Sequence, residues 1–194
     1  VTFVMITGGI DIQAGSIVGL TSIMVGVLWN DAGLNIFVAC AIALIAGALC
    51  GALSGFFVAY TGVQPMVVTL GGSFLYSGLA LAVTNMSATE AYQGISNFPE
   101  AFRAISKTKV FGVIPMQFVI FLVLVLLSYM LLHRTNYGRK IFLCGVNQSA
   151  AEFSGINSRA VIMSTYVLSG LSASIAGILL TAYLGTAKAD MGAE

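Results

Sequence analysis

The sequence predicts an all-α protein, a polytopic transmembrane helix bundle with broken or re-entrant helices. Of its 194 residues, 58% are hydrophobic and only 8% are charged, whereas soluble domains carry about 25% charged residues. Apolar runs long enough to cross a bilayer recur along the chain. One of these runs is short and follows the glycine-rich stretch "TGGIDIQAG", Thr7–Gly15. Such a pair is typical of a helix that is interrupted inside the membrane.

A transmembrane helix needs about 20 apolar residues. Val1–Thr7 has the composition of the end of one span, and five further runs follow. These runs are Gly15–Trp29, Asn35–Tyr60, Pro65–Thr84, Met116–His133 and Val161–Ala187. The chain begins inside an apolar run and ends at "KADMGAE". We therefore expect residues 1–194 to be a partial transmembrane domain, a fragment of a longer protein.

Two long polar segments separate the later runs, Asn85–Pro115 and Arg134–Ala160. The side of the membrane that carries more Lys and Arg is normally cytoplasmic. If the spans simply alternate, each side of this chain carries four such residues. Charge alone therefore does not orient the bundle.

Small residues recur at every fourth position in two of the runs, which places them on one helix face. The two rows are Ala39, Ala43, Gly47, Gly51, Gly55 and Ala59, and Ser169, Ala173, Gly177, Thr181 and Gly185. Such faces let helix backbones approach closely in lipid. We predict that Gly47, Gly51, Gly55 and Gly177 pack helices together, either within one chain or between two chains. Phe118–Leu127, with large side chains all round, is expected to face lipid.

The stretch "GGIDIQAGS", Gly8–Ser16, places Asp11 between glycines beside an apolar run. A carboxylate inside a membrane is costly and tends to face a cavity, a partner or an interface. Gly8 and Gly9 permit an irregular backbone there. The stretch is therefore a candidate pathway or switch element. The alternative is that Asp11 caps the helix that begins nearby.

A second stretch, "VQPMVVTLGGSFLYSG", spans Val63–Gly78. Pro65 suits the first turn of a helix. Gly71 and Gly72 are expected to loosen that helix in its middle. They either form a hinge that lines a pathway or allow close packing.

The stretch "CGVNQSAAEFSGI", Cys144–Ile156, predicts a short helix in the second polar segment. Asn147 can cap its start and Gly155 can end it, while Gly138 and Gly145 are expected to break the chain before it. A helix of two turns is marginal alone in water. It needs a surface to dock on, either on a partner or on its own bundle.

Signals for other functions are weak. His133 is the single histidine and lies at the end of a run beside Arg134. There is no serine–histidine or metal-ligand constellation and no phosphate-binding loop, so we expect neither an enzyme nor a bound cofactor. No basic run suggests nucleic acid. Cys40, Cys50 and Cys144 have no metal or redox spacing.

The segment "TNYGRKIFLCGVNQSAAEFSGI" resembles the cytoplasmic loop of membrane permeases from bacterial sugar ABC importers. These are the ribose, galactoside, xylose and autoinducer-2 type, related to branched-chain amino-acid permeases. The matching positions are Thr135, Gly138, Arg139, Gly145, Asn147, Ala150, Ala151, Ser154, Gly155 and Ile156. "GGIDIQAGS" is similar to a second motif of the family, with Gln13 in place of the usual serine. "QPMVVTLGG" is similar to a third, at Pro65, Thr69, Leu70 and Gly71.

The resemblance implies a multi-pass protein of the bacterial inner membrane that moves a sugar or sugar-like solute by alternating access. Its implied partners are the lipid bilayer, a second permease subunit (the same or different), a periplasmic substrate-binding protein and a separate nucleotide-binding ATPase that holds ATP and magnesium. Loop 134–160 would be cytoplasmic and carry a coupling helix, and loop 85–115 would be periplasmic.

The resemblance also assigns candidate site residues. Those at the ATPase interface are Gly138, Arg139, Gly145, Asn147, Ala150, Ala151, Ser154, Gly155 and Ile156. Those of the pathway or structural switch are Gly8, Gly9, Asp11, Pro65, Thr69, Gly71 and Gly72. The alternative function is a secondary transporter or channel that works without an ATPase, since broken helices at Gly8–Gly15 and Gly71–Gly72 would also suit it.

Overall fold

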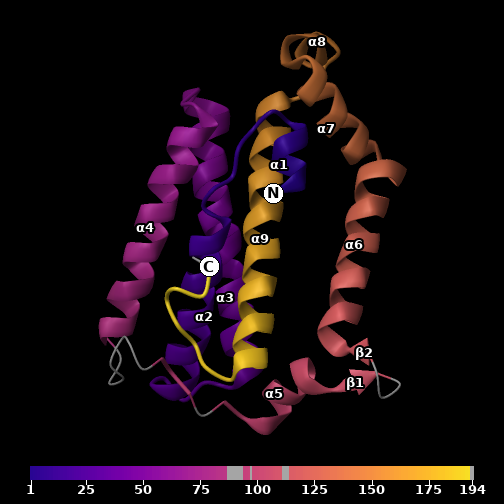
Figure 1. Ribbon diagram of the computed structural model, residues 1–194. Coiled ribbons are helices and arrows are strands. Elements are labelled where there is room, and N and C mark those ends of the chain that lie inside the picture. Colours follow the sequence, from indigo (N-terminus) through magenta and orange to yellow (C-terminus); the bar gives the residue numbers. More distant parts are fainter. Residues whose placement is uncertain (87–93, 97, 111–113, 193–194) are drawn as a thin grey trace.

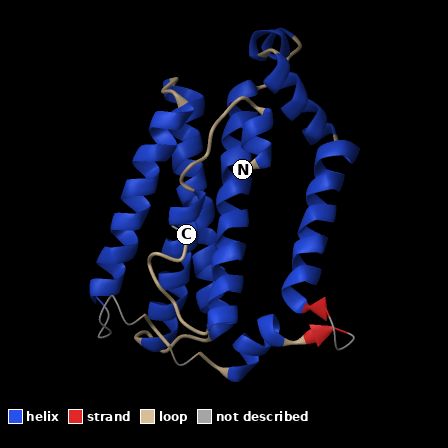
Figure 2. Cartoon of the chain, in the orientation of Figure 1, coloured by secondary structure: helices blue, strands red, loops and turns tan. Residues whose placement is uncertain are grey.

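The computed structural model describes residues 1–86, 94–96, 98–110 and 114–192. It is a bundle of helices (Figure 1), and the predicted fold class is confirmed. Within the described residues, strand structure is limited to a small antiparallel pair, β1 (Lys109–Val110) and β2 (Ile114–Pro115), together with one bridge between Ile95 and Ala187 (Figure 2).

Each apolar run that the sequence contains forms a helix. These helices are α2 (Ala14–Asn30), α3 (Ile36–Phe56) with its π-helical extension η1 (Phe57–Thr61), α4 (Pro65–Met86), α6 (Met116–Arg134) and α9 (Ser158–Leu184). By length and composition α3 with η1, α4, α6 and α9 can each cross a membrane, whereas α2 is shorter. A short helix, α1 (Thr2–Ile6), precedes them.

The ends of the long helices follow from local chemistry. The side chains of Asn35 and Asn157 accept hydrogen bonds from backbone amides in the first turns of α3 and α9, which satisfies donors that have no partner inside the helix. Gly62 ends η1 and Gly185 ends α9, each in the left-handed region at φ 72° and 70°. A side chain would be strained at that φ, so glycine is the natural stop. Gly185 ends α9 before the predicted boundary at Ala187.

The two rows of small residues bring helices together within this chain. A Cβ atom on Gly51 would lie 2.3 Å from the carbonyl oxygen of Tyr166 in α9, and one on Gly170 would lie 2.3 Å from the carbonyl oxygen of Gly47 in α3. A Cβ on Gly55 would also contact α9, and one on Gly177 would lie 2.3 Å from Thr21 Oγ1 in α2. The backbones of α3 and α9 therefore touch directly, as their side-by-side course in Figure 1 indicates.

The polar segment 85–115 contains structure that we did not predict. Helix α5 (Glu100–Lys107) buries Phe102, and Phe98 packs on it with ring centroids 5.5 Å apart. Both rings belong to a hydrophobic cluster with α2 and α9 residues. Glu90 lies outside the described residues. The segment is thus a cover over one end of the bundle, at the end of Figure 1 where α5 is labelled.

Helix α6 stands away from the rest of the bundle (Figure 1). It has no buried residue, and its large apolar side chains, such as Phe121 and Leu127, are exposed. This is the surface expected of a helix that faces lipid.

After α9 the chain turns back into the bundle. Residues 186–192 run along α2, where Ala187 pairs with Ile95 and a Cβ on Gly19 would lie 2.1 Å from the carbonyl oxygen of Ala189. We call residues 186–192 the return segment. It closes one side of the space between α2 and α4.

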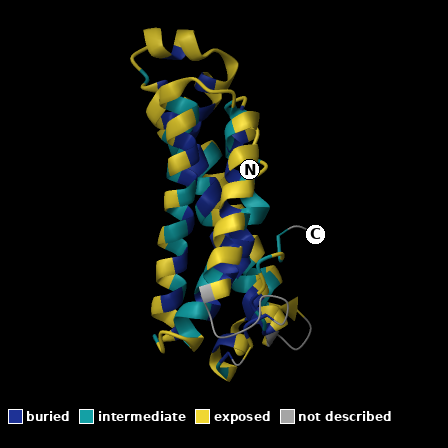
Figure 3. Ribbon diagram, turned by 90° about the vertical axis from the view of Figure 1, so that its left-hand side faces the viewer, coloured by how far each residue is buried: buried dark blue, intermediate teal, exposed yellow. Residues whose placement is uncertain are grey.

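The outer faces of the helices are largely exposed and the faces between them buried (Figure 3). At the end of α3, the exposed rings of Phe56, Phe57 and Tyr60 cluster together. Phe56 stacks on Tyr60 with ring centroids 5.3 Å apart and meets Phe57 edge to face at 6.0 Å.

Candidate functional site

The chain is irregular between α1 and α2, and we call residues 7–13 the break. Gly8 adopts φ +79°. A Cβ on Gly9 would lie 2.7 Å from the hydroxyl of Tyr166 in α9, so the backbone passes where no larger residue fits. The predicted interruption before Gly15 is present, and its glycines allow it.

Asp11 lies in this break and contacts α9. The hydroxyl of Ser169 donates a hydrogen bond to Asp11 Oδ2. The residue that precedes α2 is Gln13, and no side chain caps the helix there. The alternative role of Asp11 as a helix cap is therefore wrong, because its carboxyl group points across to α9 instead of back to the amides of α2.

Gln13 is fully buried and begins a chain of hydrogen bonds. Its Oε1 accepts a bond of 2.6 Å from the hydroxyl of Ser54 in α3, and Ser54 lies 3.1 Å from the hydroxyl of Tyr76 in α4. Tyr76 in turn donates to the carbonyl oxygen of Cys50 over 2.9 Å. One side chain at the break thus connects α2, α3 and α4.

Three buried polar atoms near the break have no hydrogen-bond partner among the described residues: Asp11 Oδ1, Gln13 Nε2 and Tyr166 Oη. Unpaired polar atoms are costly in an apolar interior. Their concentration makes the break the place where buried polar atoms without a partner gather among the described residues.

Two cavities flank the break. One, of about 500 Å³, is lined by Gly8, Gly9 and Tyr166 and reaches Gln148 and Arg159 near the start of α9. We call it the arm-side cavity. The other, of about 360 Å³, is lined by residues that follow Asp11 in the chain, together with α4 and the return segment. Asp11 therefore lies, along the chain, between residues that line one cavity and residues that line the other.

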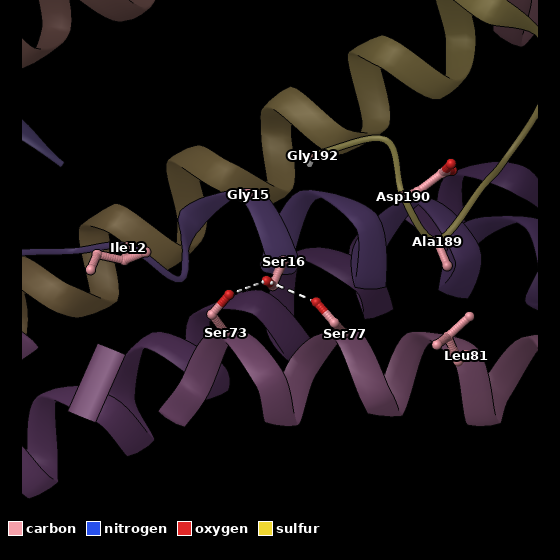
Figure 4. A pocket seen from close by; sticks show the side chains of 9 residues that line it. All are labelled: Ile12, Gly15, Ser16, Ser73, Ser77, Leu81, Ala189, Asp190 and Gly192. Carbon is pink, nitrogen blue, oxygen red and sulfur yellow. Dashed lines mark hydrogen bonds between the residues drawn. The ribbon is translucent and has the colours of Figure 1, made fainter. Parts of the chain in front are cut away.

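The second cavity contains three serine hydroxyls, and we call it the serine cavity (Figure 4). Ser16 in α2 lies between Ser73 and Ser77 of α4, with hydroxyl oxygens 2.8 Å and 3.0 Å away. Figure 4 shows the three side chains converging on one point. Asp190, from the return segment, also lines this cavity.

Helix α4 has no hinge at the glycines that were candidates for one. Helix α4 begins at Pro65, as expected, and continues through Gly71 and Gly72 without interruption. A Cβ on Gly72 would lie 2.5 Å from Gln13 Oε1, whereas one on Gly71 would meet nothing within 4 Å. Of the two alternatives for these glycines, the interrupted helix is wrong, and close packing holds for Gly72 against Gln13. The hydroxyl of Thr69 donates to the carbonyl oxygens of Pro65 and of Ile10, at 3.0 and 3.2 Å.

The segment 134–160 forms two helices, α7 (Asn136–Val146) and α8 (Gln148–Phe153), which together we call the arm. Helix α8 was predicted, with Asn147 as its cap and Gly155 just after its end. Helix α7 was not, because we took Gly138 and Gly145 for chain breaks.

That expectation is wrong because both glycines lie inside α7, at close contacts. A Cβ on Gly138 would lie 1.8 Å from the carbonyl oxygen of Leu132, and one on Gly145 would lie 1.9 Å from that of Ile6. The second contact holds α7 against the end of α1, directly before the break.

The arm also contacts the start of α9. Tyr137 lies 2.6 Å from Ser164 between their hydroxyl oxygens, and burial raises the pKa of the Tyr137 phenol, which this bond partly offsets. Ala151 is buried in a cluster with Ile141, Cys144 and Val161. The arm therefore contacts the chain on both sides of the break.

The predicted interface residues of the arm fall into two groups. Gly138, Ala151 and Ile156 pack within the chain, so the Ala151 side chain lies against the arm and the start of α9, and its role at a partner interface stays a prediction. The second group is exposed and consists of Arg139, Gly145, Asn147, Ala150, Ser154 and Gly155. Several of these have local bonds: Arg139 donates to Asn136, and Ser154 donates to the carbonyl oxygen of Ala150.

The most exposed apolar side chains of the arm were not singled out from the sequence. Val146, at the end of α7, is 88% exposed, and Phe153, at the end of α8, is 94% exposed. The sequence analysis also missed Gln13, Ser54 and Ser169 as partners at the break. The four-residue spacing of Ser73 and Ser77 was a signal that they share a helix face.

Comparisons with known proteins identify a matching family and several similar proteins. A family model described as "Branched-chain amino acid transport system / permease component" matches residues 1–194. The autoinducer 2 import system permease protein LsrD of Yersinia enterocolitica is 41% identical over 193 residues, which cover 100% of this chain and 58% of the relative. The protein of the same name from Photorhabdus luminescens is 38% identical, with 57% of its length covered. No solved structure matches. The chain thus spans little more than half the length of these relatives.

Proposed function

Because the chain belongs to the branched-chain amino acid transport system permease family, we propose that it is the larger part of a transmembrane subunit of an ATP-driven importer. As a permease component it is a multi-pass protein of the inner membrane and not itself a catalytic enzyme. The solute we propose is a sugar or a sugar-like molecule, with autoinducer 2 as the first candidate because the relatives are named for its import.

The single observation that carries the transport proposal is the position of the break. Gly8 and Gly9 of the break line the arm-side cavity and its Ile12 lines the serine cavity, and the irregular backbone between them, a feature of the broken helices of transporters, carries a carboxylate. In an alternating-access cycle, movement of this segment would open one cavity while closing the other. Asp11, with Gly8 and Gly9, would be the switch, and Thr69 and Gly72 would brace it from α4.

The partner we propose for the arm is a nucleotide-binding ATPase. Val146, just before α8, and Phe153, its last residue, are almost fully exposed, and α8 is too short to be stable alone in water. Large exposed apolar side chains at the tip of a projecting element favour docking into a groove of another protein. This proposal makes segment 134–160 cytoplasmic and 85–115 periplasmic, with α8 as the coupling helix.

The contacts of the arm would connect a movement at the proposed ATPase interface to the break. Ala151 packs with Val161 at the start of α9, and α9 carries Ser169, the partner of Asp11. Gly145 touches the end of α1, just before Gly8. A displacement of α8 would therefore act on both sides of the break at once. The complete assembly would also include a second permease subunit and a periplasmic binding protein.

The test uses the full-length protein, purified with the ATPase encoded beside it and reconstituted in liposomes. Phe153→Ala should weaken co-purification and lower permease-stimulated ATP hydrolysis by about tenfold or more, the effect of removing a central interface side chain. The matched control is Phe121→Ala, the same change on the lipid-facing helix α6, which should leave both quantities within twofold. Unchanged coupling in the Phe153 variant would contradict the role of α8.

The second candidate is a secondary transporter or channel, because the break alone would also serve such a protein. The two candidates differ in their need for ATP. Solute uptake by the full-length protein in liposomes that lack any ATPase would favour the second and exclude the importer.

A further inference from the structure

We propose that the serine cavity is a solute subsite, and that Ser16, Ser73 and Ser77 bind the hydroxyl groups of a small, neutral, polyhydroxylated solute on its way through the membrane. This inference rests on the proposed transport function and assigns that function's solute contacts to particular residues.

The first argument is unused hydrogen-bonding capacity. Each serine hydroxyl has one donor and two acceptor positions. The bonds that join Ser16 to Ser73 and to Ser77 occupy two donors and two acceptors of the set. One donor and most of the acceptor positions therefore remain for a ligand. A hydroxyl group, which donates and accepts at once, is the complement of such a set.

The second argument is the space beside these hydroxyls. The cavity measures about 360 Å³, within the range of small-molecule sites. Serines that only join two helices need no cavity next to them. In Figure 4 the three hydroxyls lie at the wall between α2 and α4, while the return segment passes farther off, and the Asp190 side chain points away from them in this view.

The third argument is the charge and polarity of the wall. Among the described residues, those that line the cavity include no Lys, Arg or His, and the acidic residue among them is Asp190. A carboxyl group favours ligands that donate hydrogen bonds and disfavours anions. Ile12 and Leu81 provide apolar contacts for C–H groups. This combination fits a neutral polyol better than an amino acid, a phosphate ester or an apolar molecule.

The fourth argument is the helix end at this wall. Helix α2 begins at Ala14, and Gly15 and Ser16 of its first turn line the cavity. The first amides of a helix have no partner in the preceding turn, and here no side chain caps them. Since Ser16 follows Gln13 by one helical turn, movement of the break would move this wall.

The experiment measures uptake of isotope-labelled autoinducer 2 by the full-length protein, reconstituted with its ATPase and binding protein. The double variant Ser73→Ala, Ser77→Ala should reduce the rate of uptake by about tenfold, the cost of two neutral hydrogen bonds in a transition state. ATP hydrolysis and the melting temperature of the complex should remain close to wild type. Ser73→Thr with Ser77→Thr, which keeps both hydroxyls, should restore uptake to within about threefold.

The matched control is Ser172→Ala. Ser172 is exposed on α9, and its hydroxyl bonds within its own helix to Leu168, so uptake should not change. A double alanine variant that takes up the solute at the wild-type rate would overturn the subsite, leaving the serines as links between α2 and α4. A wild-type protein that fails to take up either autoinducer 2 or D-ribose would overturn the proposed function, and the subsite with it. The two failures are therefore distinguishable.

Discussion

The interface between α3 and α9 and the interface between α2 and α4 join helices in the same bundle by opposite means. Between α3 and α9 the backbones touch, at Gly47, Gly51 and Gly170. Between α2 and α4 the contact combines apolar packing, of Ile17 and Leu20 with Tyr76, with the hydroxyls of Ser16 and its two partners beside a cavity. Backbone contact fixes the distance between two helices, whereas hydroxyl groups can exchange partners. The first interface is suited to a rigid frame and the second to a surface that binds and moves.

The largest expected effect is at the rigid interface. Gly51→Ala places a Cβ about 2.3 Å from the carbonyl oxygen of Tyr166, a contact that only separation of α3 and α9 can relieve. Overpacking of this kind costs about 1–3 kcal/mol, so the melting temperature of the purified protein should fall by several degrees. The control is Gly78→Ala on α4, where the added Cβ meets nothing within 4 Å. Equal losses in both variants would contradict the distinction between the interfaces.

An intermediate effect is expected at Gln13, where the two interfaces meet. Ser54→Ala removes the donor to the buried Gln13 Oε1 and should cost about 1–2 kcal/mol in the free energy of unfolding. Combining it with Gln13→Met should recover part of that loss, because neither partner is then left unsatisfied. Denaturant titration of the wild type, the two single variants and the double variant measures these free energies. If the loss in the double variant equals the sum of the two single losses, Gln13 and Ser54 are not energetically coupled.

The smallest effect is expected between α2 and α9, away from both cavities. The hydroxyl of Thr181 donates to Ser22 over 2.8 Å and also to its own helix. Thr181→Val keeps the shape and removes one bond between helices, which is worth about 0.6 kcal/mol in membrane proteins. A loss above about 2 kcal/mol in the same titration would mean that hydroxyls hold the frame as firmly as the glycines do.

Much of the fold could be predicted because the solvent for these helices is lipid. Runs of apolar residues set the positions of α3, α4, α6 and α9, and turn chemistry set their ends. Helix α7 could not be predicted in the same way. The sequence shows that Gly138 and Gly145 have a low helix propensity. Only the structure shows why glycine is needed there, because the carbonyl groups of Leu132 and Ile6 approach these positions closely.

The candidate site was predicted in part. A carboxylate between glycines marked the break, because such a group is too costly to lie in a membrane without a purpose. Its partner Ser169 is 158 residues away in the chain, and no spacing rule connects them. Ser73 and Ser77 could have been paired by their spacing, but Ser16 joins them from another helix. The roles of Ala150, Ala151 and their neighbours at a partner interface stay predictions.

The aromatic end of α3 has a consequence for how deep the protein lies in the bilayer. Helix α3 with η1 has 26 residues, or about 39 Å at 1.5 Å per residue, against a hydrocarbon thickness of about 30 Å. The exposed rings of Phe56, Phe57 and Tyr60 lie at its far end, and a tyrosine ring favours the level of the lipid headgroups. Tyr60 and Gln148 line one cavity, so α8 begins at this same end. With Tyr60 at the headgroup level, we expect Phe153 to lie at the membrane surface and outside the hydrocarbon layer.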